Sequence, residues 1–192
     1  MVELAMESAA GSEAVDALIV AVPEGMQGVP ATDVGRPVTV VAGGATRQES
    51  VLNSLRAGGD AEFVLVHDAA RCLATSELFT RVAGSLVAGD AHGVIPVVPV
   101  RDTIKRVRDG IVLGTVERDE LFVAQTPQGF RTEVLRQVHE AAASEGRTFT
   151  DDAGMLERSG YEVVVVEGEE ANFKITTLAD LERARTLAEA HA

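Results

Sequence analysis

Residues suited to phosphate chemistry stand directly after an apolar run that ends at Val66. Asp68 and Arg71 lie three residues apart there. An aspartate at the carboxyl end of a strand can ligate a hard cation such as Mg²⁺, and a nearby arginine can face a phosphate or a ribose. The alternative is an aspartate that caps the next helix and pairs with a surface arginine. We interpret His67 as a packed histidine and Cys72 as a small buried hydrophobe.

A glycine pair forms the second candidate. Gly43 and Gly44 end an apolar run, and a segment of helical period opens at Arg47. Backbone amides at such a turn can approach an anion closely, and the side chains of Arg47 and Ser50 could add donors. Glycine pairs in tight turns are also common without any ligand, so this motif alone leaves both interpretations open.

Polar loops supply the remaining candidates. Two of the 17 basic residues are lysines, Lys105 and Lys174. A genome biased toward arginine codons explains the scarcity of lysine, but the place of Lys174 in a polar loop before the last predicted helix favours a role. Thr126 and Gln128 follow another apolar run and could present hydrogen-bonding groups, although such residues are most often ordinary loop residues. Thr176 or Thr177 is a plausible cap of the last helix.

Short apolar runs alternate along the chain with segments of helical period. We predict strands at Ala17–Val22, Val38–Ala42, Phe63–Val66, Gly93–Val98, Phe122–Ala124 and Glu162–Val166. We predict helices near Glu3–Ala10, Arg47–Leu55, Ser76–Val87, Thr132–Ala143, Asp151–Arg158 and Leu178–Ala190. Continuous Val, Ile and Leu runs are typical of strands covered on both faces. The order predicts an α/β fold: βαβ units in a mostly parallel sheet with helices on both faces.

One stretch departs from this alternation, at about residues 101–120. Thr103–Arg108 and Ile111–Glu117 are extended segments joined across Asp109 and Gly110, a strong signal for a two-residue hairpin. A hairpin that projects from an α/β domain is usually a lid or an arm that grips another subunit. Its exposed edges would favour pairing with a partner.

Composition limits the classes of function. The net charge of −13 argues against a nucleic-acid surface, because phosphate contacts need clustered Lys and Arg. We find no apolar run of the roughly 18 residues that span a bilayer, and no signal peptide. A single cysteine, Cys72, excludes an internal disulfide and a site built on several thiolates. We expect one cytoplasmic domain of 192 residues that binds no nucleic acid and no membrane.

Taken together, the motifs resemble a known family. VAGG, VHDAAR, PVRDTIKRV, AQTPQGF, TDDAG and NFKITT occur in this order and spacing in the 2-C-methyl-D-erythritol 4-phosphate cytidylyltransferases, over nearly the whole chain. The resemblance implies a Rossmann-like fold, a homodimer built through the arm, Mg²⁺, and the substrates CTP and 2-C-methyl-D-erythritol 4-phosphate. It also implies roles for particular residues. Gly44 and Ser50 would contact the cytosine, and Asp68, Ala69 and Arg71 would lie where nucleotide, metal and sugar phosphate meet. Asp68 and Lys174 would act in catalysis, and the acceptor would be bound by Thr126, Lys174 and, from the second subunit's arm, Thr103 and Arg118. Lys105, on the arm, is expected to be structural.

The chain departs from the family pattern in three places. Ala45 stands where an Asp is frequent in the family, and Cys72 stands where a Pro is common. The third departure is larger: nothing in Met1–Val22 matches the family's first strand, its Gly-rich loop of the type AAGxGxR and the Pro-Lys that follows. The resemblance therefore implies a chain that begins after the triphosphate loop. Each lost cationic donor would lower the rate by about 10²–10³-fold. Three interpretations stay open: a cytidylyltransferase whose start was placed too late, a short non-catalytic paralogue that dimerises through the arm, and an enzyme for another acceptor such as ribitol 5-phosphate.

Overall fold

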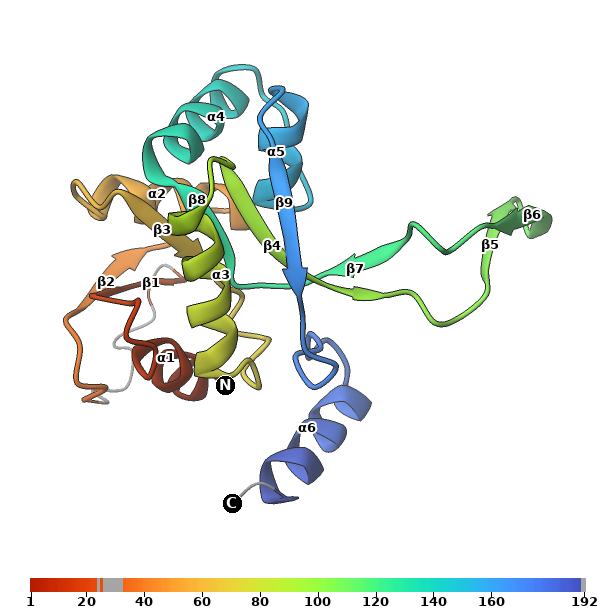
Figure 1. Ribbon diagram of the computed structural model, residues 1–192, viewed down its shortest axis with the longest axis horizontal. Helices are drawn as coiled ribbons and strands as arrows, with labels where there is room; N and C mark the ends of the chain where they lie inside the picture. Colours follow the sequence, from red (N-terminus) through yellow and green to blue (C-terminus); the bar gives the residue numbers. More distant parts are fainter. Residues whose placement is uncertain (24, 26–32, 191–192) are drawn as a thin grey trace.

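The computed structural model describes residues 1–23, 25 and 33–190 (Figure 1). The helices are α1 (Val2–Ala10), α2 (Arg47–Ala57), α3 (Ser76–Ala88), α4 (Thr132–Ser144), α5 (Asp152–Arg158) and α6 (Leu178–Ala190). The strands are β1 (Leu18–Val22), β2 (Val38–Ala42), β3 (Phe63–Val66), β4 (Gly93–Pro99), β5 (Ile104–Arg108), β6 (Ile111–Val116), β7 (Phe122–Ala124), β8 (Gln128–Arg131) and β9 (Val163–Glu167). The predicted elements are confirmed, with ends that differ by one or two residues.

The central sheet has five strands, and β4 lies in its middle. β9 pairs with β4 in parallel along one edge, while β8 and β7 pair with it antiparallel. β3 pairs antiparallel with β8, so β3, β4 and β9 point in the same direction. A parallel ladder also joins β1 to β2, and no ladder in the described part of the chain links this pair to the five-stranded sheet.

The α/β class is confirmed, but the sequence missed strand β8. Gln128–Arg131 reads as the end of a polar turn because Pro127 precedes it and Gly129 interrupts it. In the structure β8 lies between β3 and β4 and pairs with both. The predicted parallel arrangement therefore holds for β3, β4 and β9, which share one direction, and not for β7 and β8, which run antiparallel to them.

Helices cover both faces of this sheet, as predicted. On one face Val82 and Leu86 of α3 pack against Val94 of β4. On the other face Ile95 of β4 packs with residues of α4 and α5, among them Leu156. Side chains alternate between the two faces of a strand, so adjacent residues of β4 serve two different cores. The sheet thus lies between two layers of helices.

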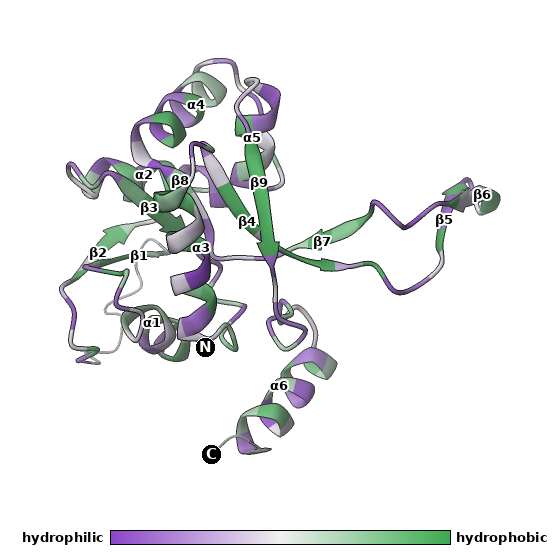
Figure 2. Ribbon diagram, viewed as in Figure 1, coloured by the Kyte–Doolittle hydropathy of each residue, from purple (hydrophilic) through white to green (hydrophobic). Residues whose placement is uncertain are grey.

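The hairpin of β5 and β6 projects far from this core (Figure 1). Its turn residues Asp109 and Gly110 both have positive φ, 51° and 79°, as a type I′ turn requires. Four apolar side chains of the hairpin are exposed: Val107, Ile111, Val112 and Leu113. Parts of the hairpin are green, the colour of hydrophobic residues, in Figure 2. The predicted arm is therefore present, and within the described part of this chain nothing covers these side chains.

The last helix, α6, also lies apart from the sheet (Figure 1). The Thr177 hydroxyl accepts a hydrogen bond from the Asp180 amide, and the Asp180 carboxylate accepts from the amides of Thr176 and Thr177. This arrangement caps the helix as predicted and fixes the loop that carries Lys174. Within residues 1–23, 25 and 33–190, no helix is long and apolar enough to cross a membrane.

We expect Gly129→Ala to destabilise the protein, because β8 touches α3 closely at this position. A methyl group on Gly129 would lie 2.9 Å from Val82 and 3.0 Å from Leu65. Overpacking of this kind lowers the free energy of unfolding by about 1–3 kcal/mol. Urea denaturation measures the change. Gly114→Ala on the exposed arm, where an added methyl meets nothing within 4 Å, is the matched control, and equal effects of the two changes would contradict the prediction.

Candidate functional site

The site is organised around the carboxylate of Asp68, which follows the end of β3. Its Oδ1 accepts a hydrogen bond from Arg47 Nε at 2.9 Å, and its Oδ2 accepts one from Lys174 Nζ at 2.8 Å. Arg47 is the first residue of α2, and Lys174 lies in the loop before α6. Three segments that are far apart in the sequence thus meet at one carboxylate, at the carboxyl end of a strand, where α/β sheets bind ligands.

The charges of this cluster are strongly coupled. Burial by itself would raise the pKa of Asp68, but the hydrogen bonds and charges of Lys174 and Arg47 outweigh it and hold the pKa at about 2. The Asp68 side chain is 16% exposed, against 43% for Lys174. Asp68 is therefore ionised at neutral pH, and Lys174 is the partner with access to solvent.

A second carboxylate, Asp152, lies behind Arg47. Arg47 Nη2 is 2.8 Å from Asp152 Oδ2, and His139 Nε2 is 2.8 Å from Asp152 Oδ1. The side chains of Asp152 and His139 are fully buried. Burial would raise the pKa of Asp152, but His139 and Arg47 lower it below its usual value. The sequence reasoning missed this pair, although Asp152 belongs to the TDDAG motif that supported the resemblance.

The glycine turn is closed by two side-chain hydrogen bonds at the start of α2. The Thr46 hydroxyl accepts from the Glu49 amide, and the Glu49 carboxylate accepts from the Ala45 amide. A side chain at Gly44 would clash, because its Cβ would lie 2.2 Å from that of Glu49. The amide of Gly44 donates to the Ser50 hydroxyl at 3.0 Å. Gly44 and Ser50 are thus brought together as predicted, one turn of chain from Arg47.

Two further predicted residues are engaged inside the protein. The Thr126 hydroxyl accepts from the Asp68 amide at 3.0 Å and lies 3.0 Å from His67 Nδ1. The Arg71 guanidinium donates to the backbone carbonyls of Asn172 and Ala124. Both side chains therefore support the site, Thr126 at Asp68 and Arg71 at the loop that leads to Lys174.

His67 is packed, as predicted. Its ring lies against Phe79, at 5.0 Å between ring centroids. Burial lowers the pKa of His67 to about 4, so the imidazole is neutral at pH 7. A neutral, enclosed ring beside Thr126 fits support of that residue better than proton transfer.

Buried amides fix the loop before Lys174. The Gln125 carboxamide donates to the Glu169 carbonyl and accepts from the Glu169 amide. Asn172, fully buried, donates to the Thr126 carbonyl and to the Gln125 side chain. Gln128, another candidate from the sequence, is also buried and donates to Asp151, the N-cap of α5. The turn between β7 and β8 is therefore a scaffold for the site.

The remaining predicted residues lie at the edge of the cluster or on the arm. Ala69 is exposed next to Asp68. Thr103 and Arg118 are exposed where the arm begins and ends, and Arg118 donates to the carbonyl of Arg101. Because the arm points away from the sheet (Figure 1), this chain does not bring them to its own Asp68. Lys105 donates to Thr115 across the hairpin, in line with its expected structural role.

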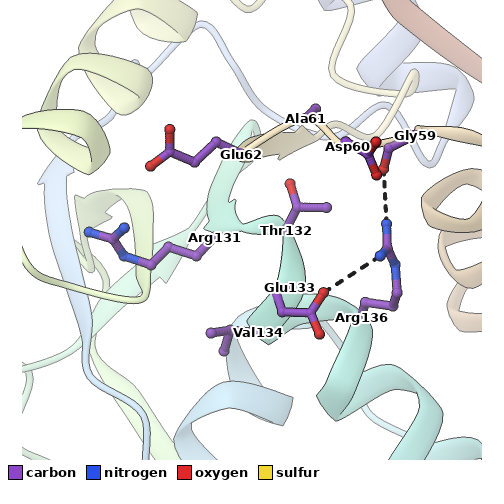
Figure 3. Close-up of a pocket in the computed structure, with 9 residues that line it drawn as sticks. All are labelled: Gly59, Asp60, Ala61, Glu62, Arg131, Thr132, Glu133, Val134 and Arg136. Atoms are coloured by element: carbon purple, nitrogen blue, oxygen red, sulfur yellow. Dashed lines mark hydrogen bonds and ion pairs between the residues drawn. The ribbon is translucent and has the colours of Figure 1, made fainter.

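A separate surface hollow of about 440 Å³ lies at the start of α4 (Figure 3). Among the described residues that line it, none is a predicted site residue. Its cations are already engaged: Arg136 donates to the Gly59 carbonyl and pairs with Glu133, and Arg131 lies over the ring of Phe63. We therefore place the candidate site at Asp68. The described residues hold no cluster of three or more His, Cys, Asp or Glu that could bind a metal ion.

Comparison with known proteins gives a consistent result. The family model described as 2-C-methyl-D-erythritol 4-phosphate cytidylyltransferase matches residues 1–190. The protein of that name from Thermosynechococcus vestitus is 55% identical over 148 residues, 76% of this chain and 62% of its own length. The one from Rhodococcus jostii is 48% identical over 190 residues, 98% of this chain and 82% of its own length. The chain thus spans less than two thirds of the first relative and about four fifths of the second.

Solved structures of the same description are also similar. The cytidylyltransferase from Thermus thermophilus has a TM-score of 0.79 at 38% identity and covers 89% of this chain and 81% of its own. The one from Francisella tularensis has a TM-score of 0.83 at 29% identity and covers 96% of this chain and 86% of its own. The fold is therefore shared as well as the sequence.

Lowering the pH should remove the stabilisation that Asp68 supplies. Its pKa is about 2 in the folded protein, against an ordinary aspartate value of 3.8, so the stabilisation is complete above about pH 5 and is lost as the pH falls toward 2. Between pH 5 and pH 3 we expect the free energy of unfolding of the unaltered protein to fall by about 1 kcal/mol more than that of Asp68→Asn. Urea denaturation at the two pH values measures this, and equal losses would contradict it.

Proposed function

Because this chain belongs to the 2-C-methyl-D-erythritol 4-phosphate cytidylyltransferase family, we propose that it transfers a cytidylyl group from CTP to 2-C-methyl-D-erythritol 4-phosphate. The products are CDP-methylerythritol, an isoprenoid precursor, and pyrophosphate. The observation that carries the proposal is the cluster of Arg47, Asp68 and Lys174 at the end of β3, beside the glycine turn. We also propose that the protein works in the cytoplasm, where CTP is available.

The reaction is an in-line displacement at phosphorus. An oxygen of the acceptor phosphate forms a bond to the α-phosphorus of CTP, and the bond from that phosphorus to the bridging oxygen of the β-phosphate breaks. Pyrophosphate leaves with the electron pair. No covalent enzyme intermediate is needed, so the protein acts by holding the reactants in line and by stabilising negative charge.

Lys174 is the proposed catalytic cation. It is the more exposed partner of Asp68, so its ammonium can turn from the carboxylate to a phosphate oxygen while its loop stays fixed. The proposed role of Asp68 is to hold Lys174 in the site before substrate arrives and to face the nucleotide phosphates. Its low pKa keeps it charged over the whole physiological range.

The nucleotide side of the site is proposed to include Gly44, Ser50, Ala69 and Arg71. The absence of a side chain at Gly44 lets the turn pack closely against Glu49, and the proposed place of the cytosine is against the backbone of this turn. The Ser50 hydroxyl, now paired with the Gly44 amide, can exchange that contact for one with cytosine. Arg71 adds a positive charge close to Asp68, although its hydrogen bonds are made to backbone carbonyls.

We propose Mg²⁺ as the cofactor, held by Asp68 together with the phosphates of CTP. Mg²⁺ is commonly bound through one or two carboxylates and substrate phosphates, so a single carboxylate at the phosphate end of the site fits it. When bound, the ion would neutralise charge on the phosphates. Asp68 would have to release one of its two cationic partners to bind it, and Lys174, the exposed one, is the partner that can move.

We propose a homodimer formed through the arm. The support is the exposed apolar surface of the hairpin and the placement of Thr103 and Arg118 away from the Asp68 cluster of their own chain. In a dimer these residues can reach the acceptor phosphate bound by the other subunit. Thr126, also expected at the acceptor, would contribute by fixing the backbone at Asp68.

Replacing Lys174 tests the proposed activity. In Lys174→Gln we expect kcat for pyrophosphate release to fall by about 10²–10³-fold, because a charged donor at the transition state is lost. Arg158→Gln, an exposed change at the end of α5, should leave kcat unchanged. A coupled pyrophosphate assay with CTP, Mg²⁺ and 2-C-methyl-D-erythritol 4-phosphate measures both.

The same assay separates the alternatives. Equal activity of Lys174→Gln and the unaltered chain would contradict the role of Lys174. No pyrophosphate release by the unaltered chain with any acceptor would support the non-catalytic paralogue. Faster turnover with ribitol 5-phosphate than with 2-C-methyl-D-erythritol 4-phosphate would move the proposal to that acceptor.

Charges on the arm should break the proposed dimer. Ile111 and Leu113 of β6 are 66% and 52% exposed. We expect Ile111→Glu with Leu113→Glu to convert a dimer to a monomer in sedimentation velocity, because charges replace apolar contact surface. Lys105→Gln on the same hairpin is the control and should stay dimeric. A monomeric unaltered chain would contradict the proposal.

A further inference from the structure

We propose that Arg47 is a positioning residue. The buried Asp152 carboxylate holds its guanidinium in place, and the guanidinium in turn holds the Asp68 carboxylate in one orientation. The sequence had suggested Arg47 as an anion donor at the glycine turn, but its guanidinium lies between two carboxylates. The inference deepens the proposed function and rests on it, because it assigns a role to a residue of the same site that does not itself bind substrate.

The geometry of the guanidinium supports this role. Nε donates to Asp68 Oδ1 at 2.9 Å, and Nη2 lies 2.8 Å from Asp152 Oδ2. A guanidinium is planar and presents its donors in a rigid fork. Once Nη2 is held by one carboxylate, the direction of Nε is therefore determined, and with it the orientation of Asp68.

The Asp152 end of this bridge is firmly anchored. Its Oδ1 pairs with His139 of α4, and both side chains are fully buried. Asp152 is also the first residue of α5, whose N-cap Asp151 is held by Gln128 of β8. Helices α4 and α5 and strand β8 thus fix Asp152 from three directions. The Asp68 carboxylate is linked to this core only through its Oδ1, which accepts from Arg47.

The two partners of Asp68 differ in a way that suits catalysis. Arg47 is 32% exposed and tied to the core, while Lys174 is 43% exposed and tied to Asp68 alone among the described residues. When Lys174 turns to a phosphate, Arg47 still compensates the charge of Asp68. Asp68 therefore keeps its position during the exchange, which a carboxylate with one partner would not do.

A purely structural role is the alternative. An unpaired buried carboxylate is strongly destabilising, so Arg47 could serve only to neutralise Asp152. The two roles differ when both partners are removed together. Replacing a whole buried pair with neutral residues is often tolerated, so stability returns, but the link to Asp68 does not.

The experiment combines Asp152→Asn with the double change Arg47→Met and Asp152→Asn. For Asp152→Asn we expect kcat for pyrophosphate release to fall by about 10²-fold, because a small misplacement of a catalytic group has an effect of this size. The KM for CTP should stay within about twofold of that of the unaltered protein. The double variant should recover the thermal midpoint while kcat stays low. Asp90→Asn, a surface carboxylate on the turn after α3, is the matched control.

A second measurement does not depend on activity. The Arg47 Nε–H signal can be assigned in nitrogen-15 NMR spectra by its loss in Arg47→Lys. We expect this proton to be protected from solvent exchange in the unaltered protein. In Asp152→Asn its protection should fall at least roughly tenfold, because residue 152 no longer fixes the guanidinium. The exposed Arg56 is the unprotected reference. Unchanged protection, or recovery of kcat in the double variant, would overturn the inference. If the unaltered protein were inactive while its Arg47 Nε–H was protected, the proposed function would be refuted. The loss of protection in Asp152→Asn would still test the role of Arg47.

Discussion

The arrangement of the site depends on one physical constraint, the charge of Asp152 in a fully buried position. A buried carboxylate needs both a hydrogen-bond donor and a counter-charge, and His139 and Arg47 supply them. Because Arg47 opens α2, this requirement fixes where that helix begins and therefore where the glycine turn before it must lie. The same guanidinium also donates to Asp68, so the pairing that Asp152 needs in the core also positions a carboxylate at the polar edge of the sheet.

The second support of the site comes from β8 and the turn before it. Thr126 fixes the backbone of Asp68, Gln125 holds Asn172 in the loop before Lys174, and Gln128 fixes the start of α5. Each of these side chains is buried and uses its polar atoms on other parts of the protein. Residues of one short segment thus hold three separate parts of the site, which is why the antiparallel strand between β3 and β4 matters for function.

The sequence predicted the elements that depend on local pattern. Continuous Val and Ile runs indicated most strands, and the start of the last helix at Leu178 followed from a threonine cap. Asp68 and Lys174 could be singled out because polar residues after apolar runs are local features. β8 could not, since its Gln, Gly and Arg lack an apolar period and gain their place from two neighbouring strands. Nor could the Arg47–Asp152 pair, whose partners are brought together only by packing. Nor could the internal hydrogen bonds of Thr126 and Arg71, because the fold brings their partners Asp68, Asn172 and Ala124 to them from distant parts of the sequence.

The acidity of the chain gives these pairings their significance. With a net charge of −13, the protein as a whole repels anions, so binding of phosphates depends on a few local cations. Lys174 and Arg47 are already paired with carboxylates, so in the proposed mechanism a phosphate would compete with Asp68 for Lys174. The exchange is feasible because Asp68 retains Arg47, and Arg47 retains Asp152. In the proposed mechanism Lys174, the exposed end of this chain of charges, would turn to an anionic substrate while Arg47 stays paired with both Asp68 and Asp152.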